Sequence, residues 1–161
     1  ITSILYLLLQ GVGEGSQPMI SQYYGKGDNR CVRATRKLAY LTAMVVTAIC
    51  MAGVYLARAK VGTLFGASQE ANAGVIQYLP LFLATLLCLA FVRITTSYFY
   101  ATEKNKLSYL LVYAEPICTL LMLLILPPVL KLTGVWLAVP IAQVLTFVIA
   151  WVAKGRVDAK I

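Results

Sequence analysis

Five long blocks of hydrophobic residues, separated by short polar segments, dominate the chain. A helix needs about 20 mostly apolar residues to cross the hydrocarbon core of a bilayer, and each block is long enough. The blocks, which predict five membrane-spanning helices, cover residues 1–24, 38–57, 75–100, 107–130 and 134–153. They lack the short period-two alternation that is typical of membrane β-barrels. The pattern therefore predicts an all-α polytopic membrane protein, with residues 1–161 in one membrane domain.

The composition agrees with this prediction. Of the 161 residues, 60% are hydrophobic and 12% are charged, and the mean hydropathy is +0.80. Such values lie outside the range of an ordinary soluble domain.

The net charge of +8 is concentrated on one side of the predicted bundle. If the helices alternate in direction, the basic residues that share the side of the C-terminus are Lys26, Arg30, Arg33, Arg36, Lys37, Lys104, Lys106, Lys154, Arg156 and Lys160. The opposite side holds Arg58, Lys60 and Lys131. Cytoplasmic loops carry the excess of Lys and Arg, so we expect a plasma (inner) membrane protein with a cytoplasmic C-terminus. The same charges would face anionic headgroups, which makes membrane lipid, and not nucleic acid, the expected partner.

A glutamate interrupts the first hydrophobic block, within the run GVGEGSQPMISQYYGKGD (residues 11–28). Gln10, Gln17 and Ser21 lie four, three and seven residues from Glu14, so a helix places all four on one face. An ionisable residue in a membrane span usually faces a bundle interior or a wet cavity. The polar stripe therefore indicates either a pathway for a polar solute or a hydrogen-bonded seam between helices.

The same block contains a proline and closely spaced glycines. Pro18 removes a backbone donor and can bend its helix. Gly11 and Gly15 form a GxxxG spacing, which permits close helix contact. We expect Gly15 and Pro18 to form a hinge beside Glu14.

Two further charges fall inside predicted spans. Arg93 and Glu115 lie at matching depths on either side of the tight turn Glu103–Lys106, roughly 10 Å from it at a rise of about 1.5 Å per residue. One interpretation is an ion pair in which each charge relieves the burial of the other. Alternatively, Glu115 is a second protonation site, or Arg93 reaches Glu14 across the bundle. Glu14 has no basic neighbour in its own helix and is the better candidate proton carrier.

The remaining chemistry of the sequence argues against an enzyme. The four cysteines are widely scattered and the chain has no histidine, so we expect no metal site and no cofactor. The spans hold no nucleophile–base pair, which leaves binding and transport as the expected functions.

Three stretches together resemble the multidrug and toxic compound extrusion (MATE) transporters. They are QPMISQYYGKGDNRCVR within residues 11–33, SYFYATEKNKLSYLLVYAEP at 97–116 and LTGVWLAVPIAQ at 132–143. The resemblance places the five spans at the eighth to twelfth helices of a twelve-helix transporter, in its C-terminal lobe. It implies that an N-terminal lobe and the seventh helix precede this segment, in keeping with a chain that starts at Ile1 and not at Met.

The resemblance implies secondary active efflux, in which two lobes rock around a central cavity and export small organic cations by antiport. The coupling ion would be H⁺ or Na⁺. The third block carries Arg93 and no acid in its middle, a departure that favours protons. Coupling would involve Glu14 and Glu115. The residues implied to line the cavity are Gln10, Gln17, Tyr6, Met19 and Arg93.

Two other functions remain open at this point. One is a flippase for lipid-linked precursors from the same superfamily, which should carry more Arg and Lys in its cavity. The other is a membrane fragment or assembly subunit that packs but transports nothing.

Overall fold

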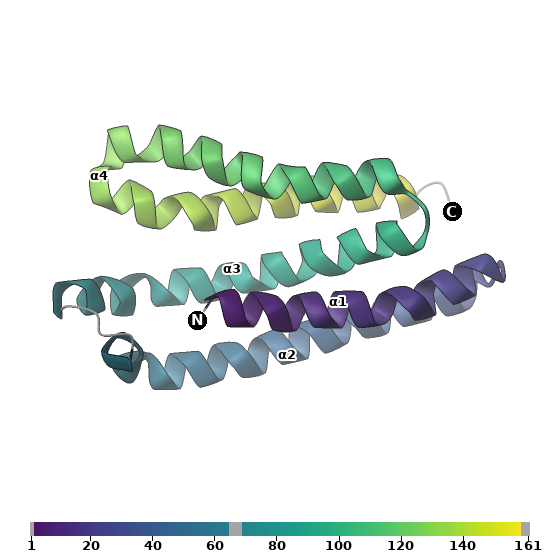
Figure 1. Cartoon of the computed structure of the whole chain (residues 1–161), viewed down its shortest axis with the longest axis horizontal. Coiled ribbons are helices and arrows are strands. Elements are labelled where there is room, and N and C mark those ends of the chain that lie inside the picture. The colour runs from purple at the N-terminus through teal and green to yellow at the C-terminus, as the bar shows by residue number, and fades with distance from the viewer. Residues whose placement is uncertain (1, 65–68, 159–161) are drawn as a thin grey trace.

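A computed structural model describes residues 2–64 and 69–158, with the side chains of residues 5–56 and 76–157. The described residues form four helices and no strand, in agreement with the predicted all-α fold. The helices are α1 (Thr2–Gly25), α2 (Asn29–Leu64), α3 (Gln69–Ala101) and α4 (Asn105–Asp158). They run alternately in opposite directions along one long axis (Figure 1).

The predicted count of five separate helices is not confirmed, because the fourth and fifth predicted spans belong to α4. At Lys131 the backbone leaves the helical region, with φ 52° and ψ −131°, and α4 folds back on itself (Figure 1). We call residues 105–130 its first arm and residues 132–158 its second arm. Gly134 permits the reversal, since a Cβ there would lie 2.4 Å from the carbonyl oxygen of Leu126. Pro127 and Pro128 weaken the helix just before the reversal, since neither can donate a backbone hydrogen bond.

The helices also extend beyond the predicted spans. α2 begins at Asn29 and ends at Leu64, whereas the hydrophobic block covers residues 38–57. α3 begins at Gln69, although the corresponding block starts at residue 75. Hydropathy reports which residues lipid can cover, but charged and polar residues continue a helix equally well outside that layer. These two helices are therefore longer than the predicted spans they contain, and the bounds of the spans stay predictions.

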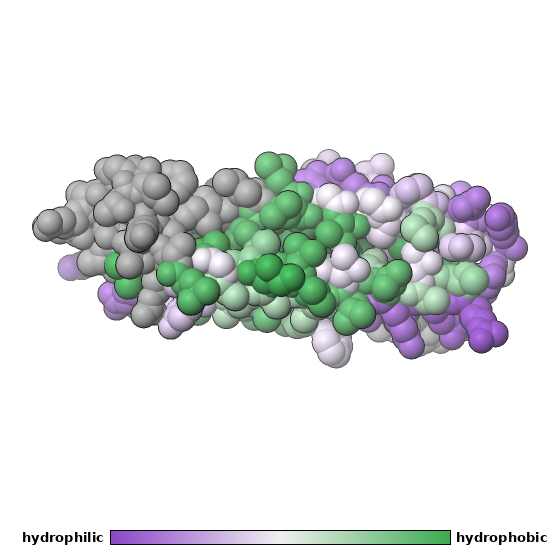
Figure 2. Space-filling view, turned by 90° about the horizontal axis from the view of Figure 1, so that it is seen from below, coloured by the Kyte–Doolittle hydropathy of each residue, from purple (hydrophilic) through white to green (hydrophobic). Residues whose placement is uncertain are grey.

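The α1–α2 turn, the α3–α4 turn and the end of α4 gather at one end of the bundle, here called the basic end (Figure 1). Gly27 (φ 72°) forms the first turn, and Glu103 (φ 58°) lies in the second. Asp28 caps α2, because its carboxylate accepts the backbone N–H groups of Arg30 and Cys31 at 3.1 and 3.0 Å. Hydrophilic residues gather at this end while hydrophobic residues cover the middle of the α2 side (Figure 2). The predicted grouping of these turns on one side is confirmed.

α3 is the central helix of the bundle. It packs against α1, α2 and α4, and α1 also packs against α2. Phe99 and Ile94 of α3 are completely buried, and they belong to two separate clusters of buried apolar side chains. One cluster joins α3 to α4 and, through Ile20 and Val32, to α1 and α2. The other joins α3 to α1 and α2.

Many large apolar side chains point outward; Leu56, Val129 and Leu132 are 83%, 75% and 73% exposed. Among the described side chains, three stretches are long and apolar enough to cross a membrane: Asn29–Leu56, Ile76–Ala101 and Asn105–Val157. The last contains both arms of α4, so four of the five predicted spans lie largely within these stretches. The predicted span at residues 1–24 does not, because Gly, Glu, Ser, Gln and Pro occupy much of the second half of α1.

Candidate functional site

The polar stripe of α1 faces away from the other helices. Glu14 is exposed, and the amide Nε2 of Gln10 donates a hydrogen bond of 2.7 Å to its Oε1. The opposite face of α1 is buried through Leu5, Leu9 and Ile20. Among the described side chains, no residue of another helix bonds to Glu14. Within this part of the chain, the seam interpretation of the stripe therefore has no support.

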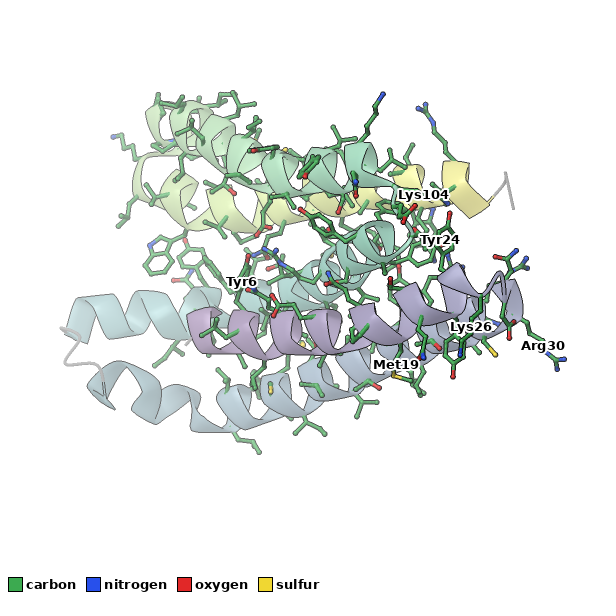
Figure 3. All side chains as sticks on the ribbon, turned by 45° about the vertical axis from the view of Figure 1, so that its right-hand side comes forward. Tyr6, Met19, Tyr24, Lys26, Arg30 and Lys104 are labelled. Carbon is green, nitrogen blue, oxygen red and sulfur yellow. The ribbon has the colours of Figure 1, made fainter. Side chains whose placement is uncertain are left out.

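The other predicted members of the stripe differ in position. Gln17 is half-buried and Ser21 is exposed, in keeping with one face shared with Glu14. Met19 is 48% exposed but lies five residues after Glu14, about 140° around a helix with 3.6 residues per turn. In Figure 3, Met19 and Tyr6 project to different sides of α1. The structure thus does not bring Met19 together with Glu14.

The predicted hinge lies in an unbroken helix, since α1 runs from Thr2 to Gly25 through Pro18. A Cβ at Gly11 or Gly15 would meet no atom within 4 Å, so neither glycine makes a close contact with the described residues. Gly13 does so instead: a Cβ there would lie 2.7 Å from Oγ of Ser97 on α3. The sequence analysis missed Gly13, which is buried although it directly precedes the exposed Glu14.

A second polar cluster is built around Arg93 of α3. Its Nη2 forms an ion pair with Oε2 of Glu115 at 2.7 Å, and the two side chains are only 18% and 21% exposed. The same guanidinium donates a hydrogen bond to the hydroxyl of Tyr6 and lies 4.1 Å from the centroid of its ring. The predicted pairing of Arg93 with Glu115 is confirmed, and the alternative pairing with Glu14 is not found.

The Arg93 cluster links three helices. Tyr6 comes from α1, Arg93 from α3 and Glu115 from the first arm of α4. Within the described residues, the Nε of Arg93 and the Oε1 of Gln143 are buried and have no hydrogen-bond partner. An unsatisfied donor is costly in an apolar setting, so the Nε of Arg93 gives this cluster a free group that water or a polar ligand can accept from.

The two carboxylates lie at the ends of one row of polar side chains. Glu14 bonds to Gln10, which lies one helical turn from Tyr6 on the same side of α1. Tyr6 bonds to Arg93, and Arg93 pairs with Glu115. A positive charge therefore neutralises Glu115, while a neutral amide is the partner of Glu14. Among the described residues, Glu115 therefore has a cationic partner and Glu14 has none.

The four cysteines are free and half-buried. Cys31 lies in the first turn of α2, Cys50 further along α2, Cys88 on α3 and Cys118 on α4. Cys50 packs against the cluster of buried side chains that joins α1, α2 and α3, where cysteine acts as a small apolar residue.

A family model described as MatE matches residues 1–123 of this chain. The match covers α1, α2, α3 and most of the first arm of α4, and it includes Glu14, Arg93 and Glu115. The second arm of α4 lies outside it, so the resemblance noted at residues 132–143 stays a prediction. No curated protein and no solved structure matches the chain.

Proposed function

This chain belongs to the MATE family of membrane transporters, and on that premise we propose that it takes part in proton-coupled export of organic cations. Members of this family are transporters rather than enzymes. The proposal adds the coupling ion, the class of substrate and the residues that act on them.

One observation carries the proposal. Glu14 is an exposed carboxylate in a largely apolar chain, and its one partner among the described side chains is the neutral amide of Gln10. A carboxylate in a membrane protein that lacks a cationic partner can take up either a proton or a cationic ligand. Competition between these two for one site is what antiport requires.

In the proposed cycle, Glu14 binds an organic cation when its site faces the cytoplasm. Rocking of the two lobes exposes the site to the outside, where protonation of Glu14 releases the cation. Return to the inward-facing state lets the proton leave to the cytoplasm and restores the affinity for the next cation. Gln10, Gln17 and Tyr6 would line the same cavity, with the aromatic ring of Tyr6 offering a face for flat cations.

Glu115 is the second candidate for proton coupling. Its carboxylate is paired with the guanidinium of Arg93. It would take up a proton only in a state in which the pair has opened, and Arg93 would then face the cavity. The N-terminal lobe of a complete transporter would cover the Glu14 face of α1, and the basic end would face the cytoplasm.

The flippase alternative receives less support. A lipid pyrophosphate needs free cationic groups in the cavity, but the guanidinium of Arg93 is already paired with Glu115. Among residues 76–157, no other Lys or Arg lies within the predicted spans.

The test is the substitution Glu14→Gln in the full-length protein, assayed in proteoliposomes with an imposed proton gradient and a fluorescent organic cation. We expect loss of proton-driven export without loss of protein from the membrane. Glu103→Gln is the matched control, because Glu103 is an exposed acid in the α3–α4 turn and should retain export. Undiminished export by the Glu14→Gln protein would refute the role of Glu14, and export driven by sodium alone would refute proton coupling.

A further inference from the structure

A hollow at the basic end is lined by cationic side chains of α2. Its volume is about 460 Å³, within the range of small-ligand sites. The described residues that line it are Arg30, Arg33, Ala34 and Lys37. All are exposed and all lie within the first three turns of α2. Arg30 lies at the capped start of that helix (Figure 3).

The three cationic side chains lie close together around one hollow. Among the described residues, none of Arg30, Arg33 and Lys37 forms an ion pair. The carboxylate of Asp28 lies beside Arg30 and offsets part of its positive charge. Its Oδ1, however, already accepts hydrogen bonds from the backbone N–H groups at the start of α2. Like charges spaced three and four residues apart on one helix face repel one another. An anion in the hollow would reduce this repulsion.

Other basic residues of the same end are placed differently. Arg36 lies over the ring of Tyr98 at 4.6 Å from the centroid, and Lys154 lies over the ring of Tyr40 at 4.9 Å. These cations are held against aromatic faces inside the bundle. The hollow is therefore lined by the basic side chains of α2 that point outward, and not by those that pack on aromatic rings.

The surface next to the hollow is apolar. Beyond Lys37, the same side of α2 continues through Leu41 and Met44, which are 63% and 44% exposed. Figure 2, a view from the α2 side, shows hydrophilic residues at the end of the molecule and hydrophobic residues further along it. A free anion or an acidic protein would contact the cationic side chains alone. A phospholipid would contact both the cationic hollow, with its headgroup, and the apolar surface, with an acyl chain.

We propose that the hollow lined by Arg30, Arg33 and Lys37 binds the headgroup of an anionic phospholipid, with an acyl chain along Leu41 and Met44. The guanidinium groups suit a phosphate, because each can donate two parallel hydrogen bonds to its oxygens. Lys37, closest to the apolar surface, extends its ammonium toward the headgroup while its aliphatic stem covers that surface. The inference is independent of the proposed transport function.

The test measures lipid binding by the full-length protein in detergent, using native mass spectrometry with phosphatidylglycerol and with phosphatidylcholine of the same acyl chains. We expect preferential retention of phosphatidylglycerol. The variant Arg30→Gln/Arg33→Gln/Lys37→Gln should lose on the order of 100-fold in affinity, since each basic residue near an anionic headgroup contributes about fivefold.

The matched control is Lys26→Gln/Lys106→Gln/Arg156→Gln. It removes the same charge from exposed residues of the same end that do not line the hollow. Retention of phosphatidylglycerol by the control and its loss from the hollow variant would support the site. Equal losses in both would mean that net charge alone attracts the lipid, and would overturn the proposal.

Two further measurements test the same site. Single substitutions at Arg30, Arg33 and Lys37 should each weaken binding about fivefold, which gives a graded answer if the triple variant does not fold. Millimolar inorganic phosphate should not displace phosphatidylglycerol, because it cannot use Leu41 and Met44. Full displacement by phosphate, or equal binding of the two lipids by the wild type, would overturn the proposal.

Discussion

The ion pair between Arg93 and Glu115 should contribute strongly to the stability of the bundle. The perturbations are Arg93→Met, Glu115→Leu and the double variant, all of which keep side chains of comparable size. Glu115→Leu removes the acceptor that lies 2.7 Å from Nη2 and leaves a guanidinium whose Nε already lacks a partner among the described residues. The hydroxyl of Tyr6 would then be its one remaining hydrogen-bond acceptor there.

The expected magnitude follows from the burial of the pair. Removing one partner of a fully buried ion pair costs about 3–5 kcal/mol. The side chains of Arg93 and Glu115 are 18% and 21% exposed, so some solvation survives. We therefore expect each single variant to lose about 2–3 kcal/mol. The double variant removes both charges together, so it should lose much less than the sum of the single variants. The coupling energy should be about 2 kcal/mol, which is within the range for residues in contact.

The assay is equilibrium unfolding of the full-length protein in mixed micelles with increasing dodecyl sulfate, followed by circular dichroism. Additive losses in the double variant would refute the reasoning, because they would mean that the two charges do not stabilise each other. Measuring export by the double variant tests separately whether Glu115 takes part in proton coupling. If Glu115 is a proton-coupling residue, recovery of stability should not restore export; if its role is confined to packing, export should return with stability.

Two other predictions concern backbone features. Gly134→Ala should destabilise the protein by about 1–3 kcal/mol, the usual cost of forced overpacking, because its Cβ would lie 2.4 Å from the Leu126 carbonyl oxygen. Gly155→Ala is the control in the same arm of α4. It should be neutral or stabilising, because a Cβ there meets nothing within 4 Å. Equal losses of thermal midpoint in the Gly134→Ala and Gly155→Ala variants would contradict the close packing at Gly134. Asp28→Ala should lower the thermal midpoint at neutral pH by removing the cap of α2. Hydrogen bonding from the backbone N–H of Cys31 lowers the pKa of Asp28 below 3.8. Its contribution is therefore present above pH 3.8 and is lost as the pH falls through the folded-state pKa, so a difference between wild type and variant that stays constant into strong acid would contradict this account.

Some features of the site followed from local sequence. The hydrophobic blocks predicted helices in a membrane because lipid solvation depends on residue type and on length alone. The facing positions of Arg93 and Glu115 followed from equal distances on either side of one tight turn. The stripe of Gln10, Glu14 and Gln17 followed from the period of the helix. Each of these depends on residues close together in the chain or on a count along one helix.

The tertiary structure decided which faces meet. Tyr6 joins the Arg93 cluster although 87 residues separate the two, and no local pattern marks that contact. Gly13, and not Gly11 or Gly15, makes the close approach to α3, because the buried face of α1 is set by the helices that pack against it. The reversal of α4 at Lys131 likewise depends on how Gly134 meets Leu126 across the two arms. The sequence by itself determined that this protein is helical, apolar and basic at one end, since those properties add up residue by residue. Only the tertiary structure separated Glu115, which pairs with Arg93, from Glu14, which forms no ion pair with a described residue. The reason is that the surroundings of a charge depend on neighbours that distant parts of the chain supply.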